Sequence, residues 1–544
     1  MKESKYPAGL FFLVFTEFWE RFGYYLMIGI FTLYMITDPS KGGLGWDNSD
    51  AADVFGTFIA LAYLTPFMGG LLADLKFGYR FSITLGGILM GIGYCMLAIP
   101  EKWAFYTALA VMVVGNGFFK PNISTLLGNL FNDPRYRHKK DTGYNIFYMG
   151  INLGAFICNF IAAIMRNKIG WDAAFITAGC GMFLGVITFW MGMKHYKHVD
   201  IRKEPKPEDK PFLMQFAKVL GVGLAFSIVG WMIPENIMGS DSTDAFFMFC
   251  IPVIYFFSSI YFKANAEEKK PLGTMFTIFI IVILFWAIFK QNGTALTTYA
   301  EFYTDRESPP AITALTDKLY FSEKLVAENK EVNQVDEQFR KIKDADGKVL
   351  KCNDYPAYFK NLDADKIPPQ GESVSLVNTE IFQSVNPFFV VVLTPLIIAF
   401  FAFMRQRNKE PTTASKIAFG LLISALSTLV MVAAVYVSDN GMHKASAWWL
   451  IASYGVITVG ELLLSPMGLS MVSKLSPVRL TALMMGGWSL ATSIGNKLSG
   501  VLAKNWDKFD NKANYFWLNF ALLMVATVIM FVLLKRLNRV FKEQ

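Results

Sequence analysis

The chain of 544 residues is 53% hydrophobic and 15% aromatic, and its mean hydropathy is +0.36. Only 17% of its residues are charged, against about a quarter in a typical soluble domain, so the composition excludes an ordinary soluble protein. The net charge of +8 does not indicate nucleic-acid binding, because the basic residues lie in short loops between long apolar runs.

Apolar runs follow one another along the whole chain. The twenty-residue criterion for crossing a bilayer predicts about fourteen membrane-spanning helices. They lie at residues 8–36, 51–73, 81–99, 103–127, 144–165, 171–193, 211–233, 245–262, 272–296, 381–404, 417–437, 445–472, 478–501 and 514–534. A polar linker that carries lysine and proline, 194–210, separates the first six runs from the next two. The sequence therefore predicts an all-α membrane protein.

The loops between these runs alternate between basic and acidic or neutral. The basic segments lie at residues 76–80, 135–140, 194–210, 263–270, 405–416, 474–479 and 535–542. Because positively charged loops stay in the cytoplasm, we expect both termini on the cytoplasmic side of the membrane, which we take to be a bacterial inner membrane.

The first run carries charges where a lipid-facing helix would have none. Glu17, Glu20, Arg21, Tyr24 and Tyr25 occupy positions i, i+3, i+4, i+7 and i+8, which form one face of a helix. A charge near the bilayer centre costs about 3 kcal/mol, so we expect this face to point inward, with Glu17 within reach of Arg21. The stripe indicates a polar pathway; the alternative is a structural ion pair that holds the first helix in place.

One long segment, 299–380, is polar and mixed in charge, and it falls on the outer side. A structureless loop of this length is uncommon in compact proteins, so we predict a small extracytoplasmic insert. From Leu315 to Lys343, apolar residues at helical spacing predict that part of the insert is helical. A disordered loop is the alternative.

Four stretches combine charged or polar residues with glycine or proline. GGLLADLKFGYR at 69–80 places glycines and Asp74 before a basic loop and resembles the loop 2–3 motif of the major facilitator superfamily; a tight turn is the alternative. GFFKPN at 117–122 places a lysine beside a proline, and FYMGINLG occupies 147–154. GELLLSPMGL at 460–469 places a carboxylate before a Ser-Pro break.

Together with the charged stripe, these stretches resemble the proton-dependent oligopeptide transporter (peptide transporter) family of the major facilitator superfamily. The resemblance covers about residues 6–540 without the insert, and the extra helices at 211–262 match the bacterial members. It implies a major facilitator fold of two six-helix bundles plus two extra helices between them. The implied divisions are an N-terminal bundle at 1–195, a linker with two additional helices at 196–271, and a C-terminal bundle at 272–544 that 299–380 interrupts.

The resemblance implies proton-coupled uptake of di- and tripeptides through a central cavity that opens to each side in turn. It implies that Arg21 and Lys120 hold the peptide carboxylate and that Glu461 holds the amino terminus. The side chains implied to assist Glu461 or to line side-chain pockets are Asn152, Asn386, Tyr25, Tyr63, Tyr148, Trp286, Ser465 and Trp488. Those implied to couple protons are Glu17, Glu20, Arg21 and Glu461. The implied partners are peptides, protons and the lipid bilayer, with no cofactor, metal or nucleic acid.

The residue chemistry supports this substrate independently. A dipeptide is a zwitterion, and the planar fork of Arg21 and the point charge of Lys120 suit its carboxylate. Glu461 suits its ammonium group, and it comes from the other half of the chain. A bound peptide would therefore draw the two halves together around a midplane site. Aromatic walls would add contact area that tolerates different side chains.

Other interpretations of single residues stay open from the sequence. Lys120 could extend to the cytoplasmic face, since its helix ends nearby. Glu461 could be the structural partner of a lysine, and Trp286 and Trp488 could serve only in packing. Asn386 precedes a proline and could only cap the start of a helix.

One position departs from the family pattern. The sequence reads FWAIFKQNG at 285–293, and Lys290 stands where the family usually has an acid that pairs with the lysine equivalent to Lys120. Like charges repel, so this inter-bundle salt bridge cannot form. Family members also often carry a second cation where this chain has Ile28. We hypothesise that Lys290 pairs with Glu461 or binds an anionic substrate.

The alternative within transport is a symporter of another small anionic or modified-peptide solute, such as nitrate or an organic anion. We expect no enzyme, because the chain has no HExxH or GxSxG motif and its four histidines lie in loops or at helix ends. A third class is a sensor whose insert binds a partner, which deletion of residues 309–369 would distinguish from a transporter.

Overall fold

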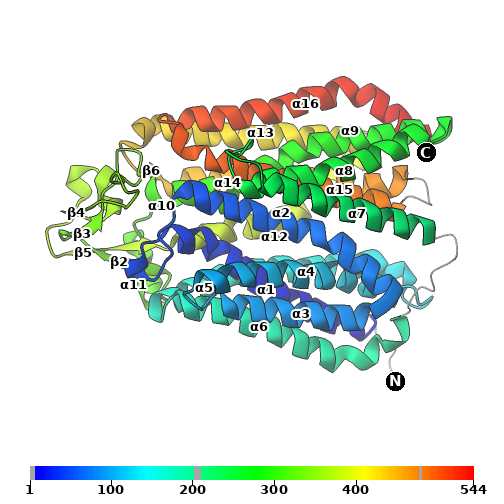
Figure 1. The fold of residues 1–544 in the computed structure, drawn as a ribbon, viewed down its shortest axis with the longest axis horizontal. Coiled ribbons are helices and arrows are strands. Elements are labelled where there is room, and N and C mark those ends of the chain that lie inside the picture. Colours follow the sequence, from blue (N-terminus) through cyan, green and yellow to red (C-terminus); the bar gives the residue numbers. More distant parts are fainter. Residues whose placement is uncertain (1–5, 201–209, 477–480, 544) are drawn as a thin grey trace.

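The computed structural model describes residues 6–200, 210–476 and 481–543. Long helices run side by side along the longest axis of the molecule (Figure 1). A small insert with short strands lies at one end, and both termini lie near the opposite end (Figure 1). The long polar segment is therefore remote from the termini, as the alternation of loops predicts.

The first six helices pack around one core of buried apolar side chains. In this core Phe31, Phe119 and Phe175 are fully buried. The helices are α1 (Gly9–Ile36), α2 (Asn48–Leu72), α3 (Tyr79–Met96), α4 (Lys102–Leu130), α5 (Lys140–Lys168) and α6 (Trp171–Gly192).

A second core joins α9 to the last four long helices, and α7 packs beside α8. The remaining helices are α7 (Lys210–Trp231), α8 (Asp241–Lys263), α9 (Ala266–Phe289), α10 (Ala295–Phe302), α12 (Val385–Gln406), α13 (Thr413–Val437), α14 (Ala447–Leu475), α15 (Thr481–Lys504) and α16 (Lys512–Glu543). Each predicted run thus contains a helix, although 478–480 lie outside the described residues. Within the described ranges, nine stretches are long and apolar enough to cross a membrane.

Polar side chains cap the N-termini of several of these helices. The Ser240 hydroxyl accepts from the backbone N–H of Thr243 at the start of α8, and the Asn265 side chain accepts from Glu268 at the start of α9. Thr412 does the same for α13. Each oxygen satisfies an N–H group that has no partner within its helix.

The insert is ordered but mostly not helical. Its elements are β1 (Thr304–Asp305), α11 (Pro310–Lys318), β2 (Ser322–Val326), β3 (Lys330–Asn333), β4 (Lys351–Asp354) and β5 (Ser373–Val377). Strand β2 pairs antiparallel with β5, and β3 with β4. Strand β1 pairs in parallel with β6 (Ala445–Ser446), in the loop before α14.

Of the stretch from Leu315 to Lys343, which we predicted to be helical in part, only residues 315–318 are helical, at the end of α11. Tyr320 adopts a left-handed backbone conformation with φ of 58°, which ends the helix. The apolar residues that follow lie in short β-hairpins, where alternate side chains point to opposite faces. The alternative of a disordered loop does not fit the antiparallel pairing of β2 with β5 and of β3 with β4.

The halves of the molecule meet at the end that carries the insert. The Thr32 hydroxyl of α1 donates to the Gly293 carbonyl over 2.5 Å, just after α9. Asn159 of α5 donates to the Ser384 hydroxyl over 3.1 Å, just before α12. Arg166, near the end of α5, forms an ion pair of 2.8 Å with Glu380. These contacts close the passage between the halves on the insert side.

Candidate functional site

The charged stripe of α1 is buried inside the protein, as predicted. Glu17, Glu20 and Arg21 are 4%, 0% and 4% exposed. Arg21 Nε lies 3.4 Å from Glu17 Oε1, and Arg21 Nη2 donates to Glu20 Oε1 over 2.5 Å. Both carboxylates therefore bind the same guanidinium, which offsets the cost of removing three charges from water.

The motif at 147–154 allows α5 to approach this stripe. A Cβ atom at Gly154 would lie 2.5 Å from the carbonyl oxygen of Phe18 and 3.4 Å from Cβ of Arg21. Only glycine fits such a close approach of two helices. The Arg21 guanidinium also lies 4.9 Å from the ring centre of Tyr24 and 5.9 Å from that of Tyr25.

Lys120 points into the protein, not toward a membrane surface. Its Nζ lies 4.2 Å from the ring centre of Tyr63 on α2, a favourable cation–π distance. It also interacts electrostatically with Arg21 and Glu20. The interpretation that Lys120 extends to the cytoplasmic face is therefore wrong.

Lys290 approaches the same tyrosine from the other half of the molecule. It lies in the turn that follows α9, and its Nζ is 5.4 Å from the ring centre of Tyr63. Tyr63 is also a hydrogen-bond partner of Lys290. Glu461 attracts Lys290 from a distance, but no ion pair within 4 Å joins these two described residues. The direct pairing of Lys290 with Glu461 is thus absent from this conformation.

Glu461 of α14 is held by a neighbouring helix. Asn386 Nδ2 donates to Glu461 Oε2 over 3.1 Å and lies 2.8 Å from the Thr458 hydroxyl. The interpretation of Asn386 as only a helix cap is therefore wrong, because its amide bridges α12 and α14. Thr458 is a member of this group that the sequence analysis missed.

Two residues of α5 lie on the same side as Glu461. Tyr148 interacts electrostatically with Glu461 and Tyr25, yet 43% of Tyr148 is exposed. The site is therefore open to solvent beside Tyr148. Asn152 donates to the Tyr148 carbonyl over 2.9 Å in its own helix, so it does not assist Glu461 in this conformation.

The remaining predicted side chains are packed closely. Trp488 is 7% exposed and meets Phe279 edge-on at 6.2 Å, whereas Trp286 is 9% exposed. Among the described residues, neither Trp286 Nε1 nor the Ser465 hydroxyl has a hydrogen-bond partner. Both polar atoms are buried in this conformation, and pocket-lining roles for these residues stay predictions.

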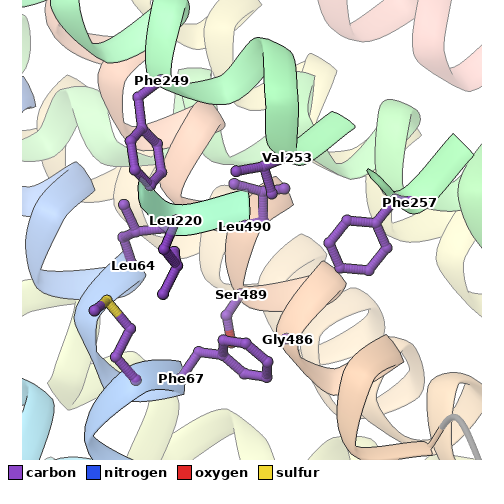
Figure 2. Close-up of a pocket in the computed structure, with 10 residues that line it drawn as sticks. Leu64, Phe67, Leu220, Phe249, Val253, Phe257, Gly486, Ser489 and Leu490 are labelled. Carbon is purple, nitrogen blue, oxygen red and sulfur yellow. The ribbon is translucent and has the colours of Figure 1, made fainter. Parts of the chain in front are cut away.

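An apolar pocket lies between α2, α7, α8 and α15 (Figure 2). In Figure 2, Leu64 and Phe67 of α2 face Leu220 of α7 and Phe249 of α8. Apart from the Ser489 hydroxyl of α15, its lining side chains are apolar. A zwitterion would lose its hydration there without gaining partners, so we do not assign the substrate to this pocket.

A buried ion pair between α2 and α15 escaped the sequence analysis. Lys497 Nζ lies 2.8 Å from Asp53 Oδ1, and Lys497 is fully buried. Hydroxyl groups at the start of α8, including that of Ser242 at 2.7 Å, donate to the same carboxylate. Each charge stands alone in an apolar run, and such charges signal a partner, although the sequence does not say which one.

The motif at 69–80 brings α2 and α4 together. Gly69 lies against the backbone of Gly117, where a Cβ atom would collide with the carbonyl group. Arg80 pairs with Asp200 at 2.7 Å and so ties the start of α3 to the segment after α6. The side chain of Asp74, predicted to pair with a cation, lies outside the described residues.

In the part of the chain that the structure describes, no cluster of His, Cys, Asp or Glu could hold a metal ion.

Known proteins resemble the whole chain. The sequence model of the POT family matches residues 80–308 and 371–518. A relative from Bacillus subtilis (strain 168), the uncharacterized transporter YclF, is 30% identical over 92% of this chain and 89% of its own length. The di-/tripeptide transporter of Lactococcus lactis subsp. lactis (strain IL1403) is 27% identical over 97% of this chain and 95% of its own.

A crystal structure of the peptide transporter POT in complex with sulfate shares the fold. It aligns with a TM-score of 0.75 at 30% identity and covers 99% of this chain and 97% of its own. The predicted major facilitator fold is thereby confirmed. The family model and the relatives together show that this chain belongs to the POT family of membrane transporters.

Proposed function

We propose that the protein takes up di- and tripeptides by proton-coupled symport and alternating access. The observation that carries the proposal is the meeting of opposite charges from the two halves. Arg21 and Lys120 come from α1 and α4, and Glu461 comes from α14. Tyr25 interacts electrostatically with both Arg21 and Glu461, so it is within range of charges from both halves. The lactococcal relative is named for the same substrates.

In this proposal the peptide carboxylate binds to Arg21 and Lys120, and its ammonium group binds to Glu461. Asn386 orients the Glu461 carboxylate through the bond between α12 and α14. A zwitterion of fixed length then connects the N-terminal half to the C-terminal half and favours their closure. Tyr25, Tyr63 and Tyr148, with Trp286, Ser465 and Trp488, would surround the peptide side chains.

Proton coupling would use the α1 stripe. Arg21 is shared between Glu17 and Glu20, so a substrate carboxylate competes with both of them for the guanidinium. A carboxylate that loses Arg21 in a buried site gains a proton more readily. Binding of substrate and of proton would therefore favour each other.

We also propose the divisions on which this mechanism depends. Bundles at 1–195 and 272–544 would move against each other, with 196–271 between them and 299–380 outside. Closure at the insert end and solvent access beside Tyr148 fit a conformation that opens toward the termini. With both termini in the cytoplasm, this is the inward-open state, and the protein has no enzymatic step.

The test is uptake of labelled Ala-Ala into proteoliposomes, with and without an inward acid gradient. We expect the gradient to drive accumulation. Glu461→Gln should lower uptake at least about tenfold, because a bond to a charged group contributes about 1.5–3 kcal/mol. Glu101→Gln, on the exposed loop before α4, is the matched control and should transport normally. Uptake that does not depend on the proton gradient, or that is unchanged in Glu461→Gln, would contradict the proposal.

Lys290 supports a second candidate, a symporter of another small anionic solute. The related transporter structure with bound sulfate is compatible with an anion in this fold. Nitrate and organic anions, added as competitors in the same assay, separate the two functions. Competition by these anions without competition by peptides would favour the second one.

A further inference from the structure

Two lysines from opposite halves of the molecule share one aromatic ring. Lys120 of α4 and Lys290, just after α9, have their Nζ atoms 4.2 and 5.4 Å from the ring centre of Tyr63. Each lysine also lies close enough to the other for their charges to repel. The two ammonium groups thus form a compact cationic site, which we call the lysine pair, at the interface between the halves.

The acids near the lysine pair are engaged elsewhere. Glu17 and Glu20 bind Arg21, and Glu461 accepts a hydrogen bond from Asn386. Among the described residues, no carboxylate lies within 4 Å of either lysine of the pair, although Glu20 attracts Lys120 and Glu461 attracts Lys290 from farther away. Tyr63 is their shared neighbour, but a cation without a close anionic partner in a site that closes around its ligand is costly, so an anionic ligand would stabilise it.

An ordinary dipeptide supplies one carboxylate at this end, which can neutralise only one member of the lysine pair. A C-terminal aspartate or glutamate supplies two carboxylates that are a few bonds apart. This separation suits two ammonium groups around a single ring. Its ammonium group would still reach Glu461, as for any other peptide.

We propose that the lysine pair makes the site selective for peptides whose C-terminal residue is acidic. The main-chain carboxylate binds at Lys120 and Arg21, and the side-chain carboxylate binds at Lys290. This inference rests on the proposed peptide transport and names its preferred substrates. An acidic residue at the N-terminus gains nothing, because its side chain lies toward Glu461, which repels it.

The test compares Ala-Glu with its isomer Glu-Ala and with Ala-Gln as competitors of labelled Ala-Ala uptake. The isomers have the same composition and net charge, so the membrane potential and the proton gradient act on them equally. Ala-Gln has nearly the same shape as Ala-Glu without its second negative charge. We expect Ala-Glu to compete at about tenfold lower concentration than either of the others, which corresponds to one well-formed charge contact.

Variants of Lys290 assign the preference to the lysine pair. Lys290→Gln should bring Ala-Glu level with Ala-Gln, whereas Lys290→Arg should keep the preference. Lys409→Gln, an exposed lysine in the loop after α12, is the control and should leave the ranking unchanged. If a Lys290 variant does not fold, the comparison of the two isomers on the unaltered protein still decides whether the site prefers an acidic C-terminal residue.

The outcomes separate the two proposals. Equal competition by Ala-Glu and Glu-Ala, or a preference that persists in Lys290→Gln, overturns the role of the lysine pair and leaves peptide transport standing. Failure of all three peptides to compete, together with absent Ala-Ala uptake, overturns peptide transport itself.

Discussion

Arg21 is the residue on which the N-terminal side of the site depends. Its guanidinium has two carboxylates and two aromatic rings around it, and all four of these groups belong to α1. Its position also depends on α5, because Gly154 lies directly against the backbone of α1. The glycine thus places Arg21 at a fixed distance from Tyr148 and from the C-terminal half.

Gly154→Ala should disturb this arrangement. The added methyl group would lie 2.5 Å from the Phe18 carbonyl oxygen, so α5 must move away from α1. Overpacking of this kind costs about 1–3 kcal/mol, and we expect a lower melting temperature in detergent together with reduced peptide uptake. Gly221→Ala in α7 is the matched control, because a Cβ atom there meets nothing within 4 Å. Equal behaviour of the two variants would contradict this role of Gly154.

At the scale of single residues, the sequence predicts those contacts that depend on spacing within one helix. The i, i+3, i+4 pattern of Glu17, Glu20 and Arg21 was sufficient to place all three on one buried face and to pair Glu17 with Arg21. The surroundings of Lys290 could not be read in the same way. Its neighbour Tyr63 is far away in the sequence, and helical periodicity does not say which helices face each other.

Among the elements, α2 and α15 are joined near the insert end by a buried ion pair. The Asp53 carboxylate binds Lys497 of α15 and the hydroxyls of Ser240, Ser242 and Thr243 at the start of α8. The extra helices α7 and α8 thereby connect to this contact. The buried ion pair is stabilised by polar groups from three helices that only folding brings together. For this reason, the pair could not be predicted from the sequence of any one apolar run.

Removal of one partner should cost more than removal of both. Asp53→Asn leaves the Lys497 ammonium buried without a charge partner, and Lys497→Met leaves the carboxylate with hydroxyls alone. Each change should lower stability by about 3 kcal/mol, whereas the double variant should regain most of this loss. The melting temperatures of the unaltered protein, the two single variants and the double variant, measured in detergent, form the double-mutant cycle. Asp133→Asn, in an exposed ion pair, should have almost no effect. Additive losses would show that the two groups do not interact.

The insert shows the limit of periodicity at the scale of elements. Long apolar runs were sufficient to predict the helices of the membrane part, because a helix forms all of its backbone hydrogen bonds within itself, as lipid requires. In the insert, short segments exchange backbone hydrogen bonds with distant partners, as β2 does with β5. Such pairings depend on residues some fifty positions apart, and spacing within either segment does not reveal them.

On the scale of the whole molecule, the insert binds to both halves at their closed end. Lys341 Nζ donates to carbonyls of the loop between α1 and α2, including that of Trp46 over 2.8 Å. Arg340 pairs with Asp510, between α15 and α16, at 2.9 Å. Opening of this end therefore requires the insert to release at least one half. The stability of its attachment contributes to the balance between the two open states.

Lys444 makes one of these attachments dependent on pH. It lies in the loop before α14, donates to the Phe302 carbonyl over 2.9 Å, and its Nζ is 4.2 Å from the ring centre of Tyr358 in the insert. Burial, with a smaller contribution from Arg306, lowers the pKa of Lys444 to about 7, although Glu301 and Asp305 act in the opposite direction. A released lysine returns to a pKa of about 10.4.

Between about pH 7 and 10 the attached state consequently binds fewer protons than the released one, so attachment strengthens as the pH rises, by at most about 1.4 kcal/mol per unit. Below pH 7 the lysine is charged in both states, and attachment is weakest there.

Hydrogen exchange of insert amides, corrected for the intrinsic rate, should therefore show greater protection at pH 9 than at pH 7. Lys444→Met should abolish the difference, whereas Lys348→Met, on the exposed side of the insert, should retain it. An unchanged pH dependence in Lys444→Met would assign the effect to groups other than Lys444. Because the pH-dependent window lies between about pH 7 and 10, acidification below pH 7 changes the contribution of Lys444 to attachment very little.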